Sequence, residues 1–364
     1  MNIVDQRRTY QLIFLQSKQE IEVGNKDHLP LPIDQLVKID AHSSCVEQVF
    51  SAGLTAIVYK IRVGNHCYNL KKKREHILVK NTDGQTSFLN EIQRRKNFYE
   101  YKSIEPEKFS HIVHTIYASL HQGFILSEWI DGDIISRFDK EIIRDIFKTH
   151  IEIEKKGLFE CDLSKNNLLI DKDKQIIFFD FGYMYPYNPL IHYNSDGKQL
   201  PIFHLCERLE SRSLMQYLMD IENDSSLMIE TFENTKRLAL EAYSEKLIWL
   251  EKNNADTDVI QWQKNWINQW EYSLKSPANL LETYELESFR SYVLDVHDDI
   301  GGKSCTPMTI KKLDKILEQI KHNYPTLKIR NGLFWGDEKL NNSSLYDKYT
   351  KLKEQACRYQ LHET

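Results

Sequence analysis

Two short segments decide the fold of this chain: Glu160-Cys161-Asp162-Leu163-Ser164-Lys165-Asn166-Asn167-Leu168-Leu169-Ile170 and Ile176-Ile177-Phe178-Phe179-Asp180-Phe181-Gly182. Their apolar runs predict two β-strands joined by a polar turn at residues 171–174. Polar groups lie at the strand ends: Asp162 and Asn167 precede the first strand, and Asp180 follows the second. Asn167 lies five residues after Asp162, and Asp180 lies thirteen residues after Asn167. This pattern can orient a hydroxyl group and bind Mg²⁺, which prefers oxygen ligands and usually combines one or two carboxylates with phosphates.

The same residues carry a resemblance to a known family. Asp162-Leu163 with Asn167, followed by Asp180-Phe181-Gly182, resembles the D-L-x-x-x-N and D-F-G motifs of the protein-kinase-like superfamily. The catalytic loop is also similar to that of the RIO and small-molecule kinases. The resemblance covers about residues 45–185 and implies an α+β, bilobal fold, with a small antiparallel-sheet lobe containing one helix and a larger, mostly helical lobe. A β-hairpin with solvent-exposed acidic side chains is the alternative interpretation.

The resemblance implies a role for each polar residue of the motif. Asp162 would accept or orient the acceptor hydroxyl, and Lys165 would partly replace the lysine that Ser/Thr kinases carry two residues after this aspartate. Asn167 and Asp180 would bind Mg²⁺. The usual His-Arg before the aspartate is Glu160-Cys161 here, so we do not expect a phosphorylated activation loop to switch the site on.

Upstream of the motif, Lys71 and Glu91 are the candidates for the ion pair that positions ATP phosphates in this superfamily. Lys71 ends an expected strand at residues 67–71, and a solvent-exposed basic edge is the alternative interpretation of the lysine-rich run there. We expect a loop at residues 81–84 and a helix that begins near Ser87 and carries Glu91. An exposed helical glutamate is the alternative.

The segment at residues 50–60 corresponds to the glycine-rich loop of the resemblance. Only Gly53 of the three usual glycines is present, and Ser51 and Ala56 replace the others. Glycine and other small residues let backbone amides approach phosphates closely. The side chains of Val58 and Leu169 would enclose the adenine base. The backbone of Glu128 and Ile130 would contact the edge of the base.

The chain has 364 residues, of which 41% are hydrophobic, so it can form two domains or one bilobal unit. We expect an N-terminal extension at residues 1–44, with a strand at residues 10–15. The kinase-like N-lobe and hinge would follow at residues 45–131, and a helical C-lobe with the catalytic loop at residues 132–300. Residues 301–364 would form a C-terminal helical segment.

Bulk properties exclude several classes of function. The net charge of −5 does not favour nucleic acid. The sequence contains no apolar stretch of about 18 residues, so we expect no membrane span. Six scattered cysteines without a C-x-x-C pair argue against zinc and disulfides. A cytoplasmic location fits this composition, and secretion into a host by a specialised system stays open.

These features predict an ATP- and Mg²⁺-dependent kinase that transfers the γ-phosphoryl group to a hydroxyl acceptor. A protein Ser/Thr side chain is the first choice, because the D-F-G and N-L-L-I residues resemble those of protein kinases. A small-molecule or sugar-lipid hydroxyl is the alternative, because no A-P-E follows Gly182. A nucleotide-binding pseudokinase is a further alternative, given the altered glycine-rich loop and Asn69 at a usually small position. Transfer of another group such as AMP also stays open.

Overall fold

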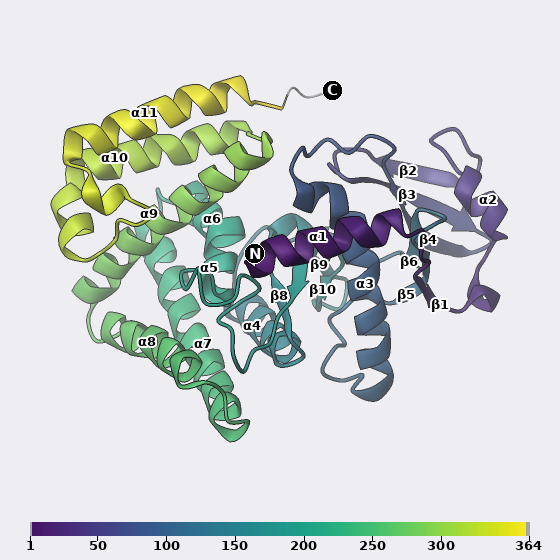
Figure 1. Cartoon of the computed structure of the whole chain (residues 1–364), viewed down its shortest axis with the longest axis horizontal. Helices are drawn as coiled ribbons and strands as arrows, with labels where there is room; N and C mark the ends of the chain where they lie inside the picture. The colour runs from purple at the N-terminus through teal and green to yellow at the C-terminus, as the bar shows by residue number, and fades with distance from the viewer. Residues whose placement is uncertain (1, 362–364) are drawn as a thin grey trace. The chain divides into compact units, whose positions relative to one another are not determined.

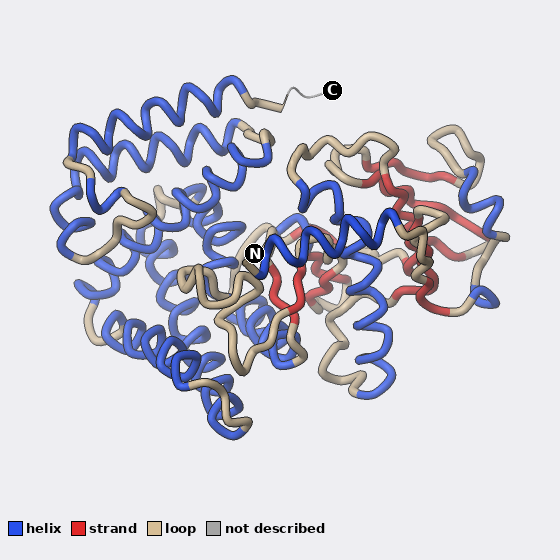
Figure 2. Tube along the Cα trace, viewed as in Figure 1, coloured by secondary structure: helices blue, strands red, loops and turns tan. Residues whose placement is uncertain are grey.

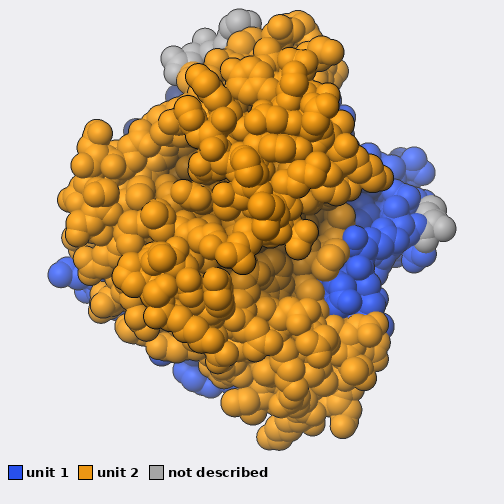
Figure 3. Space-filling view, turned by 90° about the vertical axis from the view of Figure 1, so that its left-hand side faces the viewer, with its two compact units in different colours: residues 1–136, 148–199 blue, residues 137–147, 200–364 orange. Residues whose placement is uncertain are grey.

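The computed structural model describes residues 2–361. The chain divides into two compact units, one made of Met1–Ser136 with Lys148–Gln199 and the other of Arg137–Phe147 with Leu200–Thr364 (Figure 3). The first unit contains the β-sheets and the second is helical (Figure 2). The predicted α+β class is therefore confirmed, whereas the lobe boundaries drawn from the sequence stay a prediction.

A six-stranded antiparallel sheet forms the framework of the first unit, in the order β1-β5-β6-β4-β3-β2 (Figure 1). The strands are β1 (Glu22–Gly24), β2 (Val46–Phe50), β3 (Ala56–Val63), β4 (His66–Lys73), β5 (Thr115–Ser119) and β6 (Phe124–Glu128). A tight turn joins β3 to β4, and Gly64 adopts a positive φ of 60° there, which glycine tolerates without a steric penalty. Ile61, Leu70 and Leu126 point into one core of the sheet and are fully buried.

Helix α3 (Thr82–Ile104) packs its apolar face on the sheet. Phe88, Leu89 and Ile92 of this helix form one apolar core with sheet residues such as Ile125 of β6. Their spacing of three to four residues places them on one face of the helix. The expected loop at residues 81–84 and helix start near Ser87 are wrong. The side-chain oxygen of Asn81 accepts the backbone N–H of Gly84 at 2.8 Å, so the helix begins five residues earlier than expected. Asparagine is among the preferred helix N-caps.

The expected strand at residues 10–15 is also wrong, because this segment belongs to helix α1 (Ile3–Gln16). Asn2 caps the helix by accepting the N–H of Asp5 at 2.8 Å. The run Leu12 to Leu15 contains residues that strands favour, but the cap and the packing of α1 across α3 override this local preference (Figure 1). The short elements between β1 and β2 are η1 (Lys26–His28) and α2 (Ile33–Lys38).

Two small sheets carry the motif on which the sequence analysis is based. β9 (Leu168–Asp171) and β10 (Ile176–Phe178) form the predicted hairpin, and β7 (Gly132–Ile134) pairs with the other edge of β9. β8 (Leu158–Glu160) pairs with β11 (Met184–Pro186). The last residue of β8 therefore lies beside the first residue of β11. The loop that leaves β8 and the loop that enters β11 are neighbours at this point.

The second unit is helical, as predicted for the C-terminal half. Its helices are α5 (Leu205–Leu209), a π-helix at Glu210–Leu214, α6 (Met215–Asp220), α7 (Ser225–Lys252), α8 (Thr257–Ser273), α9 (Pro277–Gly302), α10 (Pro307–Ile329), η4 (Asp337–Lys339) and α11 (Asn342–Arg358). Helix α4 (Lys140–Lys155) precedes β8 and has residues in both units. No helix within residues 2–361 is long and apolar enough to cross a membrane.

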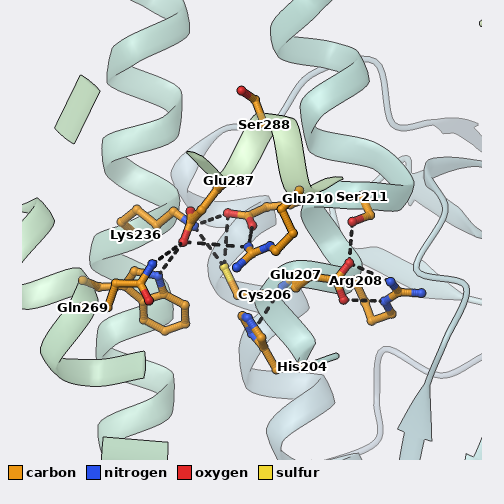
Figure 4. A network of polar contacts seen from close by, with 12 residues as sticks. His204, Cys206, Glu207, Arg208, Glu210, Ser211, Lys236, Gln269, Glu287 and Ser288 are labelled. Atoms are coloured by element: carbon orange, nitrogen blue, oxygen red, sulfur yellow. Dashed lines mark hydrogen bonds and ion pairs between the residues drawn. The ribbon is translucent and has the colours of Figure 1, made fainter. Parts of the chain in front are cut away.

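A buried network of charges lies between the helices of the second unit (Figure 4). Lys236 of α7 is fully buried and pairs with both Glu210 and Glu287. Arg290 of α9 donates to the second oxygen of Glu210 at 2.8 Å. Burying charge is costly unless each group is paired, so removing one of these four residues would leave a buried charge without full compensation.

Candidate active site

The centre of the site is a cluster of Lys71, Glu91 and Asp180. The register of the sheet sets Lys71 on β4 opposite Ile125 of β6, beneath helix α3. Its Nζ lies 2.6 Å from Glu91 Oε2 and 2.8 Å from Asp180 Oδ2. Lys71 and Glu91 are only 9% and 2% exposed. The structure therefore brings together three residues that are separated by up to 109 positions in the sequence.

The charges of this cluster determine its ionisation. Burial alone would lower the pKa of Lys71, but the carboxylates of Asp180 and Glu91 outweigh burial and raise it. Burial would likewise raise the pKa of Asp180, but the Lys71 ammonium outweighs it and lowers the pKa. Lys71 and Asp180 are both charged at neutral pH for this reason.

Arg95 holds the second oxygen of Glu91. It lies one helical turn further along α3, and its Nη2 is 3.0 Å from Glu91 Oε1. The same guanidinium donates to the carbonyl oxygen of Phe179 and to Thr115 Oγ1, and lies 5.1 Å from the centre of the Phe181 ring. Glu91 thus sits between two cations, and its position is fixed from both sides.

The catalytic loop brings Asp162 and Asn167 together. Nδ2 of Asn167 donates to the carbonyl oxygen of Asp162 at 3.0 Å and to its Oδ2 at 3.3 Å. Because Asp162 uses the nitrogen of this carboxamide, Oδ1 is the Asn167 atom suited to a cation. Lys165 begins the 3₁₀ turn η2 (Lys165–Asn167), which Ser164 caps, and its side chain is half-buried.

Asp180 links the lysine–glutamate pair to the loop that carries Asp162 and Asn167, because it lines one narrow cavity with them. Asp162, Asn167 and Asp180 line it together with Glu160. Asp180 and Asn167 supply the hard oxygen ligands that Mg²⁺ prefers, so the donor set fits this ion with phosphate oxygens completing its shell. The side chain of Asp180 is 34% exposed, which leaves it accessible to a ligand.

A family model matches the part of the chain that carries most of this site. The family described as ABC1 atypical kinase-like domain matches residues 73–194, about a third of the chain. The fold is protein-kinase-like. The matched region includes Glu91, Asp162, Asn167 and Asp180, and it begins just after Lys71. Curated protein sequences give no match to the chain.

Among solved structures, the chain is similar to WbdD. A co-crystal structure of WbdD with the kinase inhibitor LY294002 is 16% identical, and a high-resolution crystal structure of WbdD is 17% identical. A medium-resolution structure of the bifunctional kinase-methyltransferase WbdD is 16% identical. Each match has a TM-score of 0.29 and covers 39% of this chain. The matches span only about a third of the WbdD chains, from 33% to 35%.

Glu160 is part of this kinase-like site, although the sequence analysis gave it no role. It is buried at the end of β8, and its Oε1 accepts the backbone N–H of Asp162 at 2.7 Å. Burial raises the pKa of Glu160 well above its usual value, and the nearby carboxylates of Asp162 and Asp180 raise it further. The one signal in the sequence was an acidic residue ending an apolar strand.

The expected glycine-rich loop connects β2 to β3 and is held by Arg74. The guanidinium of Arg74 donates to the carbonyl oxygen of Gly53 at 2.8 Å and to that of Ser51. A Cβ on Gly53 would lie 2.8 Å from the carbonyl oxygen of Ala56, so this turn requires glycine. Both loop residues are exposed, as a phosphate-binding loop needs, but their contact with ATP stays a prediction.

The four residues predicted to surround the base lie on separate elements of the first unit. Val58 of β3 pairs with Lys71, and Glu128 ends β6 with an exposed side chain. Ile130 follows β6 and is half-buried, as is Leu169 of β9. Their roles in nucleotide binding also stay predictions.

Proposed function

We propose that this protein is an ATP- and Mg²⁺-dependent phosphotransferase that moves the γ-phosphoryl group of ATP to a hydroxyl acceptor. The observation that carries the proposal is the Lys71–Glu91 ion pair, whose lysine also lies 2.8 Å from Asp180. Asp180 in turn lines one cavity together with Asp162 and Asn167. Phosphoryl transfer needs little covalent chemistry from the protein. It needs positioned phosphates, neutralised charge and an oriented nucleophile.

Each residue of the cluster supplies one of these requirements. Lys71 would bind the α- and β-phosphates, and Glu91 would keep its ammonium in place. Asp180 and Asn167 would hold Mg²⁺, which neutralises phosphate charge when bound. Asp162 would orient the acceptor hydroxyl and take its proton. The acceptor oxygen then forms a bond to the γ-phosphorus while the bond to the β–γ bridging oxygen breaks and ADP leaves.

A protein Ser/Thr hydroxyl is the proposed acceptor, and a small-molecule or sugar-lipid hydroxyl is the second candidate. The second candidate is favoured by the sequence after Gly182, which lacks the A-P-E residues that anchor the peptide-docking platform of typical protein kinases. Efficient phosphorylation of short generic Ser/Thr peptides would count against this second candidate. Activity toward one folded protein alone would agree with the first.

The decisive experiment compares ATP labelled at the γ-phosphate with ATP labelled at the α-phosphate, each with candidate protein and small-molecule acceptors. The proposal expects transfer of the γ-label, its dependence on Mg²⁺, and its loss in Asp162→Asn. Transfer of the α-label would instead identify an AMP transferase. If neither label leaves ATP and nucleotide binding ignores Mg²⁺, the protein is a pseudokinase and the proposal is wrong.

A further inference from the structure

Helix α3 carries a second buried polar residue directly beside Glu91. Asn90 is 0% exposed, and its Nδ2 faces three backbone carbonyl oxygens. They belong to Phe181 at 3.3 Å, Gly182 at 3.0 Å and Met184 at 2.7 Å. These residues follow Asp180 immediately in the chain. One side chain therefore fastens the helix that holds Glu91 to the segment that holds Asp180.

Asn90 and Glu91 are adjacent on α3 but contact different parts of the site. Glu91 reaches Lys71 on the sheet, and Asn90 reaches the backbone after Asp180. Arg94, one turn along α3, adds a hydrogen bond to the Met184 carbonyl at 3.2 Å. If α3 rotated or moved away, both connections would break together. The positions of the phosphate-binding lysine and of the metal-binding aspartate are thus linked through one helix.

Helix α1 contributes one of the two side chains that orient the Asn90 amide. Gln11 of α1 is 2% exposed, and its Nε2 donates to Asn90 Oδ1 at 3.4 Å. The other end of the Gln11 amide accepts a hydrogen bond from Thr86 Oγ1 at 3.2 Å. Because Asn90 Oδ1 faces donors from Gln11 and Arg94, its Nδ2 is left to face the carbonyls of the segment after Asp180.

Charged side chains of helix α1 also contact both α3 and the segment that follows Asp180. Arg7 and Arg8 both pair with Asp83 in the first turn of α3, at 2.9 and 2.6 Å. The guanidinium of Arg7 also stacks on the ring of Tyr185 in β11, 3.4 Å from its centre. Helix α1 therefore bridges α3 and the strand that follows Asp180, and Figure 1 shows it lying across α3.

We propose that α1 is an intramolecular activator of the site and that Asn90 is the positioning residue through which it acts. In kinases, the lysine–glutamate pair and the D-F-G aspartate must both be in place before phosphoryl transfer. Here the residue before Asp162 is Cys161 rather than an arginine that a phosphorylated loop could bind. Docking of α1 replaces that signal, and release of α1 from α3 turns the site off. This inference rests on the proposed function for its effect on turnover, but its structural part does not.

The test uses the full chain with Gln11→Leu and Asn90→Leu, each of which replaces a side-chain amide by an apolar group. Gln16→Leu is the matched control, because Gln16 lies on the same helix with an exposed side chain. Hydrogen exchange of the backbone amides within residues 181–186, of which Pro186 has none, reads the position of the segment, with β3 and β4 as the internal reference. Binding of ATP with Mg²⁺ and turnover are measured on the same samples.

We expect both leucine variants to speed exchange at residues 181–186 by about tenfold or more. In Asn90→Leu the buried carbonyls lose their donor, and in Gln11→Leu the Asn90 amide that donates to them loses a partner that orients it. Exchange in β3 and β4 should not change. Turnover should fall at least about tenfold through kcat, while Gln16→Leu behaves as wild type. A general loss of folding would instead speed exchange everywhere.

Two results would overturn the inference: unchanged exchange at residues 181–186 in Gln11→Leu, or full activity in a variant whose segment has become mobile. If Asn90→Leu does not fold, Gln11→Leu alone decides, since it leaves α3 intact. If wild type transfers no phosphate, the proposed function fails. The exchange data still decide whether α1 positions the segment after Asp180.

Discussion

Replacing Glu91 by glutamine should destabilise the first unit and weaken nucleotide binding together. The substitution keeps the shape of a side chain that is 2% exposed but removes its charge. Lys71 and Arg95 contact the two carboxylate oxygens at 2.6 and 3.0 Å, and the carboxamide can accept a hydrogen bond from only one of them. Breaking a buried ion pair by removing one partner costs about 3–5 kcal/mol. Lys71 keeps Asp180 and Arg95 keeps a backbone carbonyl, so we expect the lower end, about 3 kcal/mol.

The assay is a urea titration in which pulsed hydrogen exchange follows the amides of β4, so that unfolding of the first unit is read separately from that of the second. Glu100→Gln is the control, because Glu100 lies on the exposed side of the same helix. The affinity for ATP with Mg²⁺ should fall as well, since Lys71 is left to pair with Asp180 alone. A change below about 0.5 kcal/mol, the range of ordinary surface substitutions, would refute the ion-pair reasoning.

Three other predictions follow from the same contacts. Asp162→Asn should reduce turnover by about 10²–10⁴ and leave binding of ATP with Mg²⁺ nearly intact, whereas Asp180→Asn should weaken both, as calorimetry and labelled-ATP assays would report. The lowered pKa of Asp180 means that its ionised form stabilises the fold above pH 3.8, and this contribution is lost as the pH falls further. The difference in unfolding free energy between wild type and Asp180→Asn should therefore shrink below pH 3.8. Lys236→Met should destabilise the second unit by about 3–5 kcal/mol in denaturant titrations, because Glu210 and Glu287 stay buried and share Arg290 as the remaining cation of the network. An unchanged midpoint would contradict that account.

Sequence reasoning located the elements whose signals are local. The hairpin of β9 and β10 and the strand that carries Lys71 follow from short apolar runs and turn residues. The same reasoning was wrong about α1, because strand-favouring residues outweighed the Asn2 cap that begins the helix. It also placed the start of α3 too late, because Asn81 was taken as part of a loop rather than as a cap.

The sequence by itself named the residues proposed to carry the chemistry, through its motifs and the family resemblance that they imply: Lys71, Glu91, Asp162, Asn167 and Asp180. Only the tertiary structure revealed what holds them. Asn90 contacts carbonyls 91 to 94 residues further along the chain, and Gln11 reaches Asn90 across 79 residues. Periodicity and motif spacing report on neighbours within a few residues. A buried amide must form hydrogen bonds, and its partners are the backbone groups that the fold brings beside it.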